Sequence, residues 1–79
     1  MVHGTIKFSE NESKFCIVDE ENMKFIDFLE FGDEFEVLCE DKWVPTKLEI
    51  ITNEAGELIF SLKGTSYNGI LDGVEVRKN

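Results

Sequence analysis

At 79 residues the chain can build only one small hydrophobic core, and we expect residues 1–79 to fold as a single domain, alone or as a small oligomer. Hydrophobic residues make up 42% and charged residues 32% of the chain, values that argue against wholesale disorder. The net charge of −9 arises entirely in residues 1–41, which hold 12 Asp or Glu against three Lys. Direct binding to nucleic acid or to an anionic membrane is disfavoured, because both need clustered Lys and Arg.

The first predicted elements form a β-hairpin. Residues 2–9 alternate apolar and polar side chains, which is typical of a half-buried strand. A polar turn follows, and residues 14–18 place Phe15 and Ile17 on one face of a second short strand. The charged residues 19–22 then close this strand.

Residues 23–31 allow two interpretations, because their apolar spacing fits a helix about as well as an irregular strand. We favour a strand through about Asp27, followed by a tight turn at residues 29–33 that contains Gly32. The alternative is a single helical turn.

The second half of the chain predicts a meander of three antiparallel strands. In residues 34–40, apolar side chains alternate with acidic ones, which indicates a strand with one acidic face. Asp41 and Lys42 can form the loop into a strand over residues 43–51, where Pro45 indicates an edge position or a bulge. A strand at residues 58–62, a loop at 63–69 and a short strand at 74–77 complete the chain.

Short strands separated by regular turns predict an all-β fold. The expected architecture is a small five- or six-stranded antiparallel barrel, SH3-like, with one short helical turn as the variant at residues 23–31. The chain has no basic stretch followed by an apolar run and no segment near the ~20 apolar residues of a membrane span, so we expect a cytoplasmic protein.

Four segments occur in an order that resembles an uncharacterised family, a domain of unknown function in short proteins of Gram-positive bacteria, their phages and mobile elements. The segments are Gly32–Val37, Trp43–Glu49, Phe60–Leu62 and Gly73–Arg77. They are similar to that family's W-x-x-T-[RK]-[IL]-E centre and G-x-x-V-R ending, over residues 29–77. The resemblance implies a phage or mobile-element origin and transfers no activity.

Catalytic and metal chemistry lack their usual residues. The only histidine is His3, near a chain end, and no phosphate-binding loop, dinucleotide turn or zinc motif is present. Cys16 and Cys39 lie in apolar segments without CxxC spacing, which predicts buried thiols. We therefore expect no enzyme, no catalytic residue, no metal site and no cofactor.

Three classes of function remain. The first is an acidic protein-binding module, an inhibitor of a host defence protein in the phage setting, whose carboxylates dock on a basic surface; the candidates are Glu34, Glu36, Glu40 and Asp41. The second is a small-ligand or nucleotide-signal binder with a pocket lined by Trp43, Lys47, Tyr67 and Arg77. The third is a structural accessory domain. A solubilising acidic face and a Trp43 packed in the core are the simpler readings of the same residues.

Overall fold

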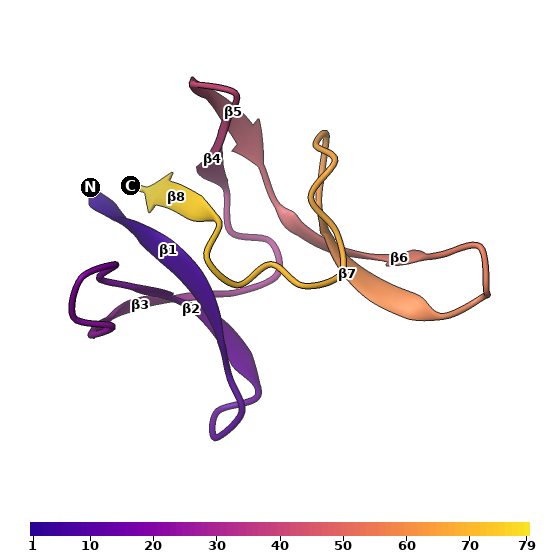
Figure 1. The fold of residues 1–79 in the computed structure, drawn as a ribbon, viewed down its shortest axis with the longest axis horizontal. Coiled ribbons are helices and arrows are strands. Elements are labelled where there is room, and N and C mark those ends of the chain that lie inside the picture. Colours follow the sequence, from indigo (N-terminus) through magenta and orange to yellow (C-terminus); the bar gives the residue numbers. More distant parts are fainter.

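The computed structural model describes residues 1–79, and every regular element in it is a β-strand (Figure 1). The predicted all-β class is confirmed, and the chain has no helix that could cross a membrane. The eight strands are β1 (Val2–Ser9), β2 (Lys14–Val18), β3 (Phe25–Leu29), β4 (Phe35–Cys39), β5 (Lys42–Thr46), β6 (Leu48–Thr52), β7 (Leu58–Leu62) and β8 (Glu75–Lys78).

Six strands form one antiparallel sheet in the order β3-β2-β1-β8-β4-β5, and β6 and β7 form a separate two-stranded hairpin. The last strand, β8, lies between β1 and β4, so the two chain ends are neighbours and Val2 is paired with Lys78 (Figure 1). The end strands β3 and β5 do not pair with each other. The expected small barrel is thus an antiparallel sheet that curls without closing.

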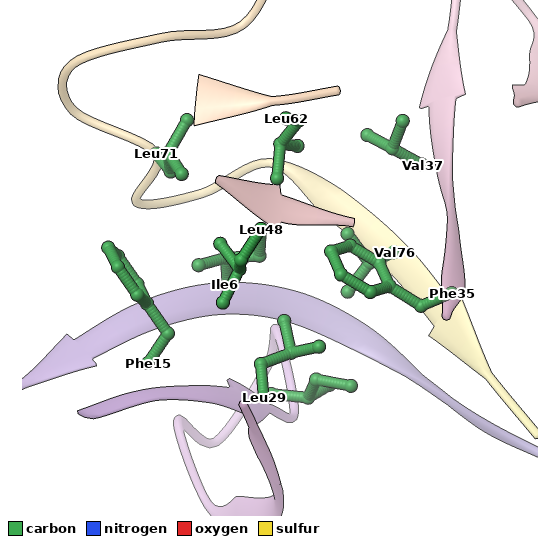
Figure 2. Close-up of a cluster of buried hydrophobic side chains, with 10 residues drawn as sticks. Ile6, Phe15, Leu29, Phe35, Val37, Leu48, Leu62, Leu71 and Val76 are labelled. Carbon is green, nitrogen blue, oxygen red and sulfur yellow. The ribbon is translucent and has the colours of Figure 1, made fainter. Parts of the chain in front are cut away.

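One face of this sheet packs against the base of the β6–β7 hairpin and forms the core. Ile6, Val37 and Val76 from the sheet meet Leu48 and Leu62 from the hairpin (Figure 2). All five side chains are buried, and burial of each stabilises the fold by about 1.5–3 kcal/mol. We call the opposite face of the sheet the outer face.

Residues 23–31 contain a strand and no helical turn, so the favoured choice of strand over helix is confirmed, although β3 begins and ends two residues later than predicted. β3 ends at Leu29, and the turn after it is closed by a hydrogen bond from Asp33 N–H to the Glu30 carbonyl, with Gly32 at φ +93°. A bulge opposite Ile17 and Val18 gives β3 an extra residue. This bulge breaks the period-two alternation, and the broken alternation is what made a helix plausible from the sequence.

The predicted strand over residues 43–51 is wrong in one respect, because it is divided at Lys47 into β5 and β6, which belong to different sheets. The expected three-stranded meander is therefore two separate hairpins, β4–β5 and β6–β7. Thr46 and Leu48 are both buried, and a single straight strand would also bury residues two positions apart. In the structure, however, the chain passes from the large sheet to the β6–β7 hairpin between these two residues. The β4–β5 loop is Glu40–Asp41, one residue earlier than predicted, and β5 is an edge strand as Pro45 indicated.

Lys78 on β8 holds the curled sheet together. Its Nζ donates to the carboxylates of Asp33 at 3.0 Å and Asp27 at 3.4 Å and to the Phe28 carbonyl at 3.1 Å. β8 and β3 are three positions apart in the sheet, about 14 Å if it were flat, which is too far for a lysine side chain to span. The curl brings them within reach.

The charges of this cluster are mutually stabilised. Burial opposes the charge of Lys78, but the hydrogen bonds to Asp33 and Asp27 outweigh it and raise the pKa of Lys78 above its ordinary 10.5. The pKa of Asp33 is lowered below its ordinary 3.8, first by the hydrogen bond from Glu30 N–H and further by Lys78. The folded state therefore favours the ionised form of both groups.

Candidate functional site

Trp43 and Arg77, two of the residues predicted to bind a ligand, touch on the outer face. The Arg77 guanidinium carbon lies 4.4 Å from the centre of the Trp43 ring, and Arg77 Nε donates to the Glu36 carboxylate at 2.7 Å. His3 meets the Trp43 ring edge-on at 5.6 Å, and its Nε2 lies 2.6 Å from the Glu75 carboxylate. The charge of Arg77 and the ring of Trp43 are thus already engaged within the protein.

The other two predicted ligand-binding residues lie elsewhere. Tyr67 packs against the core and donates its hydroxyl hydrogen to a β4 carbonyl at 3.1 Å. Lys47 lies at the junction of β5 and β6, with its Nζ 3.7 Å from the Glu34 carboxylate. The structure therefore brings together two of the four residues, Trp43 and Arg77.

The predicted acidic residues are placed in two settings. Glu36 is half-buried against Arg77, and Glu34 is exposed beside Lys47. Glu40 and Asp41 form the tip of the β4–β5 hairpin and have no cationic partner. Only the hairpin tip therefore carries uncompensated charge from this set.

A groove lined half by hydrophobic and half by polar or charged residues lies on the outer face of β1, β2 and β3, and we call it the outer groove. It has a volume of about 740 Å³, and Cys16, Val18 and Phe28 belong to its lining. Met23 and Phe25 also line it and are 51% and 56% exposed. Phe25 contacts Phe28 edge-on at 4.8 Å between ring centres. Met23 and Phe25 thus expose a small apolar surface within the groove.

The rim of the outer groove is acidic. Glu10, Glu12 and Asp72 line it together with Lys7, and none of these four side chains has an oppositely charged partner within 4.0 Å. Three carboxylates against one ammonium leave the rim with a net charge of −2. The outer groove thus combines an open apolar surface with free negative charge.

A second hollow, the aromatic pocket, lies beside the turn end of the β1–β2 hairpin and has a volume of about 480 Å³. Four phenylalanines line it, with ring centres 4.8 to 6.4 Å apart: Phe8, Phe15, Phe31 and Phe60. Lys14 and Glu30 form an ion pair at 2.9 Å and also line the pocket. Volumes of this size are usual for small-molecule sites.

Sequence reasoning missed both hollows, since each depends on how neighbouring strands fold over one another: residues within 7–28 and Asp72 line the outer groove, and the aromatic pocket adds Phe60. One signal was present, because β2 has apolar side chains on both faces: Phe15 and Ile17 inward, and Cys16 and Val18 outward. A strand with one face in water would alternate with polar residues. That pattern could have indicated that the outer face of β2 is covered or binds something.

These features define a small all-β domain with an acidic surface and a partly apolar outer groove. A family described as a domain of unknown function, DUF5348, matches residues 4–78, and the chain belongs to this family. The match also takes in β1 and β2, which lie outside the likeness expected over residues 29–77. No curated protein and no solved structure matches the chain.

Proposed function

We propose that this protein is a small acidic protein-interaction module that binds a partner with a basic surface through the outer groove. Apolar side chains of the partner enter the groove, and its Lys or Arg side chains face the rim. The observation that carries the proposal is the placement of unpaired Glu10, Glu12 and Asp72 around the exposed Met23 and Phe25.

The apolar contribution can be estimated from exposure. About half of Met23 and half of Phe25 remain exposed, and full burial of such side chains contributes about 1.5–3 kcal/mol each. Covering both therefore contributes about 1.5–3 kcal/mol, or roughly 10- to 150-fold in affinity. The rim carboxylates add faster association and selection for basic partners.

We further propose that the partner is a nucleic-acid-handling protein of a host cell, and that the carboxylates occupy its basic channel. A phage or mobile-element origin and an action in the host cytoplasm accompany this proposal. It is supported by the excess of nine acidic over basic residues, a net charge that ion pairs within the chain leave unchanged.

The experiment is affinity capture from host lysate on the immobilised full chain, at low and high salt. Raising the salt to about 1 M shortens the screening length to about 3 Å, so a contact made through the acidic rim is released. The wild type and the Glu10→Gln/Glu12→Gln variant are compared, and we expect the variant to retain less of the captured protein.

The control is Glu54→Gln/Glu57→Gln, which makes the same change in charge on the β6–β7 turn. Retention by this control should equal that of the wild type. If the loss instead follows Glu40→Gln/Asp41→Asn at the β4–β5 tip, that tip and not the outer groove makes the contact. Equal retention by all variants at both salt concentrations would refute the module.

The second candidate function is small-ligand binding, and the aromatic pocket is the observation that favours it. The pocket has the volume of a small-molecule site, and Phe31 at its mouth is 56% exposed. Under this alternative, an apolar aromatic compound raises the melting temperature of the wild type and has no effect on Phe31→Ala. If the ligand is instead a nucleotide that stacks on Trp43, adding a nucleotide raises the melting temperature of the wild type and has no effect on Trp43→Ala.

A further inference from the structure

The edges of the two sheets differ in how they are protected. Exposed strand edges present unpaired N–H and C=O groups to other chains, and proteins usually block them. On β5, Pro45 lacks an N–H where the strand faces solvent. On β3, the Phe28 N–H donates to the Asp27 carboxylate at 2.9 Å, and the Phe28 carbonyl accepts from Lys78 at 3.1 Å. Each end strand of the large sheet therefore has one position at which strand addition is blocked, Pro45 on β5 and Phe28 on β3.

The free side of β7 is also occupied. Gly69 N–H donates to the Phe60 carbonyl at 2.8 Å, and Leu62 N–H donates to the Tyr67 carbonyl at 3.1 Å. Residues 67–69 thus run along β7, with an isolated β-bridge between Ser61 and Asn68. Of the strand edges, the outer edge of β6 is the one that has no such protection.

The hydrogen-bond pattern shows which groups β6 leaves free. Lys63 N–H donates to the Lys47 carbonyl, and Asn53 N–H donates to the Glu57 carbonyl. The odd-numbered residues from 47 to 53 therefore bond to β7. In an antiparallel pair the residues between them turn their N–H and C=O groups to the other side. Ile50 and Thr52 are exposed, and no hydrogen bond in the structure uses their outward groups.

The side chains beside this edge are equally uncovered. The hairpin projects away from the sheet (Figure 1), and Ile50 and Leu58 on its core-side face are 52% and 75% exposed. Glu49 points to the opposite face and has no cationic partner. A strand added here would place an apolar residue beside Ile50 and a Lys or Arg beside Glu49.

We propose that the outer edge of β6 receives an extended segment of a partner protein, in which apolar and basic residues alternate. This inference rests on the proposed interaction function and names a second contact, made through the backbone. A second copy of the chain is a poor occupant, since each chain carries a net charge of −9. Backbone pairing supplies affinity, and the alternating side chains supply selectivity.

The test uses a blocked hexapeptide of alternating Lys and Val, added to the full chain while amide hydrogen exchange is followed by NMR. In the free protein, the amides of Ile50 and Thr52 should exchange faster than those of Glu49 and Ile51, which bond to β7. With peptide, exchange at Ile50 and Thr52 should slow by at least about tenfold. The same peptide with alternate amides N-methylated should have no such effect.

A matched pair of variants completes the test. Ile50→Pro removes one outward N–H of β6, whereas Leu58→Pro removes an outward N–H on the opposite side of the hairpin. We expect the first to weaken peptide binding about fivefold or more and the second to leave it unchanged. Unchanged exchange at Ile50 and Thr52 with millimolar peptide, or equal loss in both variants, would overturn strand addition. Neither result bears on Glu10 and Glu12, so the outer groove is tested separately.

Discussion

Lys78→Met should destabilise the fold more than any other surface lysine substitution. The Lys78 side chain is 18% exposed, and the variant removes one donor from each of two carboxylates and from a carbonyl. Hydrogen bonds to charged groups contribute about 1.5–3 kcal/mol each, and the exposure of Asp27 and Asp33 reduces this. We expect a loss of about 2 kcal/mol, which lowers the melting temperature of a domain of this size by roughly 8–16 °C.

This loss is measured by thermal and urea unfolding, monitored by circular dichroism. The control is Lys63→Met, because Lys63 is exposed and has no ion-pair partner. The control should change stability by less than about 0.5 kcal/mol. Because the pKa of Asp33 is lowered in the folded state, its ionised carboxylate contributes to stability above pH 3.8. This contribution disappears as the pH falls through the lower pKa of the folded state.

Because the pKa of Lys78 is raised in the folded state, its charged form contributes to stability below pH 10.5. This contribution disappears only as the pH rises through the still higher pKa of the folded state. The difference between wild type and Lys78→Met should therefore be constant at neutral pH and shrink in acid below 3.8. A variant as stable as Lys63→Met, or a difference that persists at the lowest pH, would refute the reasoning.

Three further predictions concern packing, turn geometry and thiol reactivity. Gly4→Ala should lower the free energy of unfolding in urea by at least about 2 kcal/mol, because a Cβ there would clash with the carbonyl oxygen of Val18 on β2; a smaller loss would mean that the strands can separate locally. Replacing Glu40 with Asn and Asp41 with Gly should stabilise the hairpin by about 1 kcal/mol, since both residues have positive φ, +48° and +67°; no gain would contradict a type I′ turn. Cys16 is buried and burial raises the pKa of its thiol, so a thiol reagent at neutral pH should label Cys39 first, and faster labelling of Cys16 by mass spectrometry would contradict its placement.

The sequence predicted those parts of the fold that depend on local patterns. Period-two alternation identified the β1–β2 hairpin and β4, Gly32 located a turn, and Pro45 indicated an edge. The division of residues 43–51 at Lys47 could not be predicted, because a straight strand and a crossing between sheets leave the same alternation. That difference is decided by long-range packing of the core.

The candidate site was less accessible to prediction, since it depends on which strands are neighbours. Trp43 and Arg77 meet only because β8 inserts between β1 and β4, which no local pattern encodes. Likewise, the acidic residues stood out as one group in the sequence, but ion pairs neutralise Glu36 while Glu10 and Glu12 stay free. Free charge is a property of the folded surface and cannot be counted from the sequence.

The central claim is that the outer groove binds a basic partner, and the most direct test is a titration of the captured protein by isothermal calorimetry. Phe25→Thr removes the most exposed aromatic ring of the groove, and Ile70→Thr is the control, because Ile70 is 89% exposed but lies outside the groove. We predict a loss of affinity of roughly four- to fifteenfold for Phe25→Thr, none for Ile70→Thr, and weaker binding of the wild type at high salt. Equal affinities of the two variants would contradict the account.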